Sequence, residues 1–163
     1  TGVVMEVEGG VPGVQVGNEV QVTIRSDAQF RKDEDGLDTT GLSFASGADL
    51  LVGQVVKIRP RSTAAGPPIA IATDRVRLRE TRLTATIKSV VNSTTFVVGD
   101  LPALFTSATP AISELEVRLK PGETEFEDGV AVTPAVGDIV SLRGLLFRAD
   151  PRPVLVAKKV RKR

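Results

Sequence analysis

The chain has 163 residues, a net charge of +1, and neither cysteine nor histidine. Without these side chains it has no disulfide, no thiol nucleophile, no Ser-His-Asp arrangement and none of the commonest zinc ligands. Its 15 Gly and 10 Pro, together with abundant Val, Thr and Ile, favour short strands joined by tight turns. No apolar run approaches the roughly 20 residues that cross a bilayer as a helix, so we expect no membrane span.

Strand patterns alternate with turn signals through the first half of the chain. Residues 2–8 have the apolar density of a strand, and residues 20–25 alternate strictly between apolar and polar side chains. A further short strand is expected at residues 14–16. Residues 31–49 break the pattern, which predicts a long loop or an extended hairpin. Alternation returns before the end of this half and places three arginines on one strand face, namely Arg75, Arg77 and Arg79.

The second half repeats this plan. Residues 136–144 repeat the pattern of residues 52–60, in which Val-Gly and a polar residue precede alternating apolar positions and an Arg. Residues 101–113 form an insertion that the first half lacks. The chain then ends in a basic segment, which contains Lys158, Lys159, Arg161, Lys162 and Arg163.

The repeat predicts two domains. The first is residues 1–80 with the long loop 31–49, and the second is residues 81–163 with the insertion 101–113 and the basic end. Each half holds about five or six short strands, the number that a small closed or nearly closed barrel uses to remove its sheet edges. We therefore expect an all-β protein made of two tandem small OB-like β-barrels joined by a short linker. A small sandwich is the alternative, because alternation alone does not fix the strand order.

Short motifs shared by the two halves resemble those of the bacterial domain of unknown function 5666. The matches are Val16-Gly17-Asn18 with Val98-Gly99-Asp100, Phe30 with Phe126, Gly53 with Gly137, and residues 72–76 with residues 157–160. The resemblance implies OB-type barrels that occur in tandem in exported or envelope-associated proteins, and it carries no catalytic residues. The sequence begins with Thr1 rather than Met, which is compatible with a removed export signal or an excised fragment. We therefore expect an extracellular or cell-envelope location.

An acidic cluster surrounds Gly36 in the loop 31–49. Its carboxylates Asp33, Asp35 and Asp38 could hold Ca²⁺, which takes six to eight oxygen ligands. The alternative is a solvated hairpin tip, since the spaced ligands of an EF-hand are absent. A second acidic stretch is typical of a wet turn rather than of a catalytic acid and base pair. It comprises Glu123, Glu125, Glu127 and Asp128. We expect no other cofactor.

Basic and aromatic residues define the candidate surface for a ligand or partner. The basic candidates are Arg75, Arg77, Arg79, Lys158, Lys159 and Arg161. Three of the six Phe occupy core positions of the repeat, which leaves as exposed candidates Phe44, Phe105 and Phe147. The absence of Trp and Tyr counts against base stacking and against an aromatic platform for sugars. We therefore do not expect nucleic acid as the partner.

These features favour a non-enzymatic structural or interaction module of a bacterial exported or cell-surface assembly. Its partners would be other protein subunits or copies of the chain itself, docked through the segments 31–49 and 101–113 or through open strand edges. The alternative is an OB-type ligand-binding module for single-stranded nucleic acid or oligosaccharide. A binding module should show a cleft lined by Arg77, Arg79 or Phe147, whereas an assembly subunit should show flat apolar loop surfaces.

Overall fold

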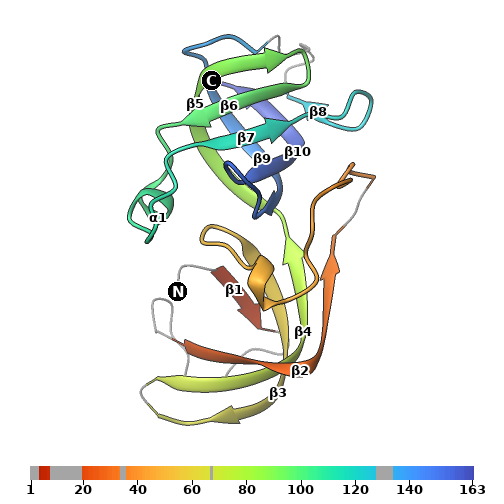
Figure 1. Ribbon diagram of the computed structural model, residues 1–163, viewed down its shortest axis with the longest axis vertical. Helices are drawn as coiled ribbons and strands as arrows, with labels where there is room; N and C mark the ends of the chain where they lie inside the picture. The colour runs from red at the N-terminus through yellow and green to blue at the C-terminus, as the bar shows by residue number, and fades with distance from the viewer. Residues whose placement is uncertain (1–3, 8–19, 34–35, 67, 128–133) are drawn as a thin grey trace.

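The computed structural model describes the chain except for residues 1–3, 8–19, 34–35, 67 and 128–133. The described chain is all-β, as predicted, with one short helix, α1 (Ala103–Thr106), and a 3-10 turn at Gly47–Asp49. The strands form a four-stranded sheet and a six-stranded sheet, and the larger sheet closes into a barrel. The barrel lies above the smaller sheet in Figure 1. No helix in the described ranges has the length and apolar character needed to cross a membrane.

The first sheet has the strand order β1-β3-β4-β2. Its strands are β1 (Val4–Val7), β2 (Val20–Lys32), β3 (Val55–Ala64) and β4 (Ile69–Arg79). β3 and β4 are antiparallel, whereas β2 runs parallel to β4 and β1 runs parallel to β3. The strand expected at residues 14–16 lies outside the described residues, so a first barrel in this half stays a prediction.

Five strands of the second half close the barrel. They are β5 (Thr81–Asn92), β6 (Thr95–Gly99), β7 (Leu115–Arg118), β9 (Ile139–Phe147) and β10 (Val154–Lys162). β5, β6 and β7 form an antiparallel meander, and β9 returns to lie beside β5, which gives the strand order of a Greek key. β10 closes the barrel by pairing with β9 and, in parallel, with β7. A short strand, β8 (Glu125–Phe126), also pairs with β10.

The strand registers give the sequence repeat a structural counterpart. Phe30 lies opposite Val76 in the parallel ladder of β2 and β4. Phe126 lies opposite Val160 in the parallel ladder of β8 and β10. The strands β1, β3 and β4 thus correspond to β5, β9 and β10, and the long strand β2 corresponds to β7 and β8 together, which both run parallel to β10. One difference is that β1 is parallel to β3, whereas β5 is antiparallel to β9.

The repeated Val-Gly motif forms a tight turn that its polar residue stabilises. Gly53 and Gly137 have φ angles of 90° and 91°, as the third residue of a type II β-turn requires. The N–H of the next residue donates to the carbonyl three residues back, at 3.1 Å in both copies. The side chains of Gln54 and Asp138 accept from the N–H of that same earlier residue, at 2.6 Å and 3.2 Å. The motif is therefore conserved between the halves because it builds the same turn.

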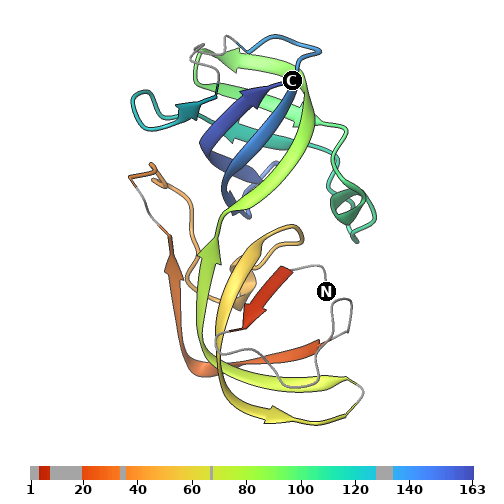
Figure 2. The ribbon, with the colours of Figure 1, turned by 180° about the vertical axis from the view of Figure 1, so that it is seen from behind.

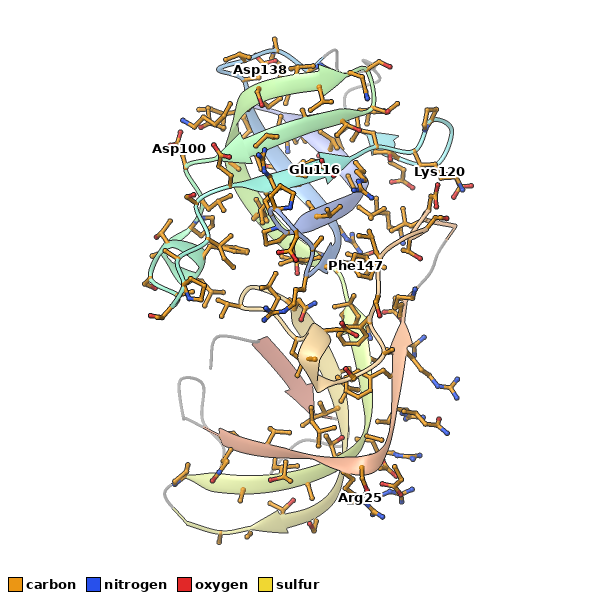
Figure 3. The ribbon with its side chains drawn as sticks, in the orientation of Figure 1. Arg25, Asp100, Glu116, Lys120, Asp138 and Phe147 are labelled. Carbon is orange, nitrogen blue, oxygen red and sulfur yellow. The ribbon has the colours of Figure 1, made fainter. Side chains whose placement is uncertain are left out.

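The hairpin of β9 and β10 is buried on both faces over part of its length. Side chains on one face, such as Leu146, belong to the core of the barrel. Side chains on the other face complete the core of the first sheet, namely Leu145, Phe147, Val154 and Val156. Figure 3 shows Phe147 between the barrel and the first sheet. The two halves of the chain therefore share this hairpin, and the first sheet depends on it for its core.

The two long segments also pack within the chain. In the segment 31–49, Phe44 is buried in the core of the first sheet. In the segment 101–113, Phe105 belongs to α1 and is buried in the core of the barrel, where its ring covers Gly53. These apolar side chains are therefore not available to a neighbouring subunit.

The expectation that Phe44, Phe105 and Phe147 are exposed is wrong. Their exposed fractions are 4%, 2% and 0%. The expectation treats each half as a barrel with a core of its own, but both cores contain side chains from both halves, including Leu51 in the core of the barrel. The three rings fill these composite cores, so Phe105 and Phe147 offer no surface to a ligand or partner.

Polar side chains also connect the halves. Gln54 is fully buried, and its Nε2 donates to the carbonyl of Leu146 in β9 at 2.9 Å. The buried hydroxyl of Thr81 donates to the carbonyl of Gly53 at 3.0 Å. Because a buried polar group without a partner costs about 1–3 kcal/mol, these bonds fix how the repeated turn meets the barrel.

Phe147→Ala should lower the free energy of unfolding by about 3–5 kcal/mol, the usual cost of truncating a buried Phe. Since Phe147 joins the two halves, we expect a single cooperative urea transition that shifts as a whole, followed by circular dichroism. Phe126→Ala truncates a half-buried ring and is the matched control with a smaller expected loss. Two separate transitions, of which only one shifts, would contradict a shared core.

Gly53→Ala should destabilise the chain more than Gly137→Ala. Both replacements force a residue with a side chain into a positive φ, which costs about 1–2 kcal/mol. At Gly137 an added Cβ meets no atom within 4 Å, whereas at Gly53 it would overlap the ring of Phe105. Overpacking should add about 1–3 kcal/mol at Gly53, measured by urea unfolding. Equal losses in the two variants would show that Phe105 does not pack on this turn.

Candidate functional site

An open groove of about 600 Å³ lies on the outer wall formed by β5, β9 and β10. Figure 2 shows these three strands side by side. The charged side chains that line the groove are Arg82, Arg143, Lys159, Arg161, Arg163 and Glu127. Five cations thus surround one carboxylate in a chain whose net charge is only +1. The lining of the groove is therefore strongly cationic although the chain as a whole is almost neutral.

Strand alternation explains how β9 reaches both the groove and the first sheet. Successive side chains of a strand point to opposite faces, so odd-numbered residues of β9 share its outer face. Ser141 and Arg143 line the groove, whereas Leu145 and Phe147 pack on the first sheet. The outer face of β9 therefore changes from cationic to apolar around Gly144.

A register shift lets β10 follow the same change. Val154 and Val156, which are even-numbered, face the first sheet, whereas Lys159 and Arg161, which are odd-numbered, line the groove. The ladder of β9 and β10 shifts by one residue between Ala157 and Lys159. Such a bulge moves the following side chains to the other face of a strand. The shift therefore places the basic end of the chain on the outer wall.

Three cations lie directly opposite one another across this wall. Arg82 in β5 is in register with Arg143 in β9, which is in register with Lys159 in β10. We call these three residues the barrel row. Neighbouring strands lie only about 4.8 Å apart. Like charges placed directly opposite each other destabilise a sheet, so the barrel row needs anions nearby.

Two carboxylates supply part of this negative charge. Glu80, the single residue between β4 and β5, pairs with Arg143 and, at 3.1 Å, with Lys158. Glu127 pairs with Lys159 at 2.7 Å. Burial raises the pKa of Glu80, but its bonds to Lys158 and Arg143 outweigh burial and hold the pKa below the ordinary value. The bond to Lys159 likewise lowers the pKa of Glu127, so both carboxylates are ionised at neutral pH.

The groove retains donors that point to solvent. Arg82 makes no ion pair with any residue of the described ranges. Arg161 meets Glu127 only at 3.6 Å, and 54% of its side chain is exposed. The hydroxyls of Thr84 and Ser141 lie 3.3 Å apart between the cations. The groove therefore offers guanidinium groups and hydroxyls to an anionic ligand.

The structure brings part of the predicted basic surface to this groove. Lys159 and Arg161 line it, and Lys158 pairs with Glu80 at its border. The sequence gives no signal for Arg82 and Arg143, because neither belongs to a series of cations on every second residue of its strand. Only the register across β5, β9 and β10 unites them.

The predicted arginines of β4 lie elsewhere. Arg75, Arg77 and Arg79 occupy the outer face of β4, as predicted, while Val76 and Leu78 are buried in the core. None of these arginines and no Phe line the groove. It is therefore a different site from the cleft lined by Arg77, Arg79 or Phe147 that was predicted for a binding module.

The candidate calcium ligands are engaged in other contacts. Asp33 pairs with Arg77 and, at 2.8 Å, with Arg79. Asp38 accepts from the N–H of Thr40 at 3.0 Å. Asp35 lies outside the described residues, and the described ones contain no group of three or more acidic, His or Cys side chains that could hold a metal ion. Calcium binding by this loop stays a prediction.

Comparison with known proteins adds no assignment. No protein-family model matches the chain, and no curated protein sequence matches it. The resemblance to the domain of unknown function 5666 therefore stays a prediction.

We expect the chain to lose stability as the pH falls through the folded-state pKa values of Glu80 and Glu127. These values lie below the ordinary value of 4.5, so the ion pairs stabilise the fold above that pH and are lost on acidification. Protonation also leaves the barrel row without its counter-charges. Urea unfolding between about pH 7 and pH 3 measures the loss.

Glu80→Gln should lower stability at neutral pH and reduce the loss on acidification. Glu125→Gln removes the same charge from an exposed position in β8 and is the matched control. A Glu80→Gln variant that loses as much stability in acid as the parent chain would contradict the role of this carboxylate.

Proposed function

We propose that the chain is a non-enzymatic binding module that holds an acidic glycan in the groove of its barrel. The observation that carries the proposal is the barrel row, three cations in register across adjacent strands. Carboxylate or sulfate groups of a glycan would pair with Arg82 and add to the negative charge that Glu80 and Glu127 supply to this row. Bonds between ionised donors and acceptors are about twice as strong as neutral ones, and Thr84 and Ser141 lie beside the row to contact sugar hydroxyls.

The architecture of the barrel supports an OB-type assignment. OB barrels have five strands in Greek-key order and bind oligosaccharides and oligonucleotides, mainly on their second and third strands and adjoining loops. In this chain those strands are β6 and β7, whereas the groove lies on β5, β9 and β10. The loop after β9 joins the fourth and fifth strands of the barrel and is one of the usual OB binding loops. Here it contacts the first half, because Arg148 donates to the carbonyl of Leu50 at 2.9 Å. We therefore place the ligand by charge rather than by analogy of fold.

The lining of the groove favours a glycan over nucleic acid. Sites for single-stranded nucleic acid combine a basic groove with aromatic side chains on which bases stack. The residues that line this groove include no aromatic side chain. An acidic glycan needs only cations and hydrogen-bonding groups, both of which the groove contains.

A self-associating subunit is the second candidate function. Exposed apolar residues near one another favour it, and they belong to β5, to the turn before β9 and to the start of β9: Val90, Val91, Val136 and Ile139. Backbone bonds between Ile87 and the residues 137 and 138 bring these two segments together. Of the long segments, 101–113 adds the exposed Leu104, whereas Phe44 and Phe105 are buried within the chain.

Arg82→Gln and Arg161→Gln should each weaken binding of a sulfated octasaccharide about tenfold, which corresponds to about 1.4 kcal/mol. Arg118→Gln removes the same charge from β7, outside the groove, and should leave binding unchanged. Isothermal titration calorimetry at two salt concentrations measures both effects, since binding by charge weakens as salt screens it.

Two comparison ligands complete this experiment. Uncharged dextran should not bind, and oligothymidylate should bind more weakly than the glycan because the groove has no stacking residue. If oligothymidylate bound more tightly than the glycan, the proposed ligand would be wrong and single-stranded nucleic acid would be the better candidate. If only Arg118→Gln lost binding, the ligand would bind on β6 and β7, the usual OB surface, and not in the groove.

A further inference from the structure

We infer that the outer face of the first sheet is a second binding face for the same anionic groups, so that one chain binds an acidic polymer at two places. The inference rests on the proposed function of the groove, because it extends the chemistry of the groove to the other half of the internal repeat. Figure 3 shows nitrogen-tipped side chains that project outward from the first sheet.

The repeat places cation pairs at the same ladder positions in both halves. Arg59 lies opposite Arg75 in the ladder of β3 and β4. Arg143 lies opposite Lys159 in the ladder of β9 and β10. Arg59 and Arg143 are the Arg that ends the apolar alternation of the repeated motif in each half. In both halves, two cations therefore lie directly opposite each other on neighbouring strands, an arrangement that destabilises a sheet.

Cations continue beyond each pair on every second residue. In β4 they are Arg77 and Arg79, whose side chains are 51% and 40% exposed. In β10 and just after it they are Arg161 and Arg163. The period of two keeps each series on one face, with about 6.7 Å between successive positions along the strand. Each half thus presents a line of cations along its last strand.

A third strand adds a cation in both halves. Arg31 in β2 lies opposite Arg77 in β4, which lies opposite Lys57 in β3. We call these three residues the sheet row. It corresponds to the barrel row in consisting of three cations in register across three adjacent strands. The two rows differ in position, because the sheet row lies two residues along the ladder from the pair of Arg59 and Arg75, and its third strand is β2 rather than β1, the counterpart of β5.

Each half also has a carboxylate shortly after the repeat Phe that pairs with two cations of the last strand. Asp33 follows the repeat residue Phe30 and pairs with two arginines of β4. Glu127 follows the matching Phe126 and pairs with two cations of β10. One carboxylate between two guanidinium or ammonium groups leaves donors for an external anion. Each face therefore has one carboxylate that two cations of its last strand share. A second carboxylate accompanies each face: Asp74 pairs with Arg59 in the first half, and Glu80 pairs with Arg143 in the second.

Two cationic faces on one chain predict a measurable stoichiometry. A short acidic ligand should bind at two places, whereas a long polymer that reaches both faces should bind more tightly without any new contact. Isothermal titration calorimetry of the full chain with a sulfated tetrasaccharide should give about two ligands per chain. Arg118→Gln should keep that value.

Charge removal separates the two faces. The double variant Arg31→Gln with Arg77→Gln should reduce the stoichiometry to one and leave the groove occupied. The double variant Arg82→Gln with Arg161→Gln should also reduce it to one and leave the first sheet occupied. Circular dichroism should match the parent chain, and replacement of Arg31 and Arg77 by Lys should restore the second ligand.

The results distinguish failure of the inference from failure of the proposed function. One ligand per chain, lost in Arg82→Gln with Arg161→Gln and retained in Arg31→Gln with Arg77→Gln, would overturn the second face and keep the groove. One ligand that only the first-sheet variant removes would overturn the groove. No binding by the parent chain would overturn both.

Discussion

The β9–β10 hairpin contacts three regions of the molecule: the core of the barrel, the core of the first sheet and the basic groove. Its inner face fills the barrel, while its outer face covers the core of the first sheet at one end and lines the basic groove at the other. Gly144 and Ala157, which lie opposite each other, mark the change. A Cβ at Gly144 would overlap the carbonyl oxygen of Val156, so the two backbones approach closely there. The joining of the halves and the position of the cations both follow from the register of this hairpin.

The shared hairpin also explains how a chain with few aromatic residues builds two cores. Units of about 80 residues bury only a modest fraction of their surface, and this chain has six Phe and no Trp or Tyr. Each core therefore gains from side chains of the other half. Phe147 enters the core of the first sheet from β9, and Leu51 enters the core of the barrel from the repeated turn. These residues are buried because the two halves contact each other, and neither half alone would bury them.

Local features of the fold could be predicted from the sequence, and long-range ones could not. Alternation and turn residues predict an all-β chain, the equivalence of Gly53 and Gly137, and the common face of Arg75 to Arg79, because each depends on neighbouring positions. The barrel row depends on which residues of different strands lie opposite, and nothing in one strand records that register. The burial of Phe105 and Phe147 depends on packing between the halves, so the candidate site was only partly predictable.

The two rows of cations bear on how a ligand would be held. Each row places like charges in register, which lowers the stability of the sheet, and local conflicts of this kind tend to mark functional positions. The chain is almost neutral overall, so its long-range field is weak and attraction becomes strong only within a Debye length of about 8 Å at physiological salt. Glu80 and Glu127 already occupy part of the cations' bonding capacity. An external anion therefore has to compete with these carboxylates, which favours a ligand with several charges on one chain over a single small anion.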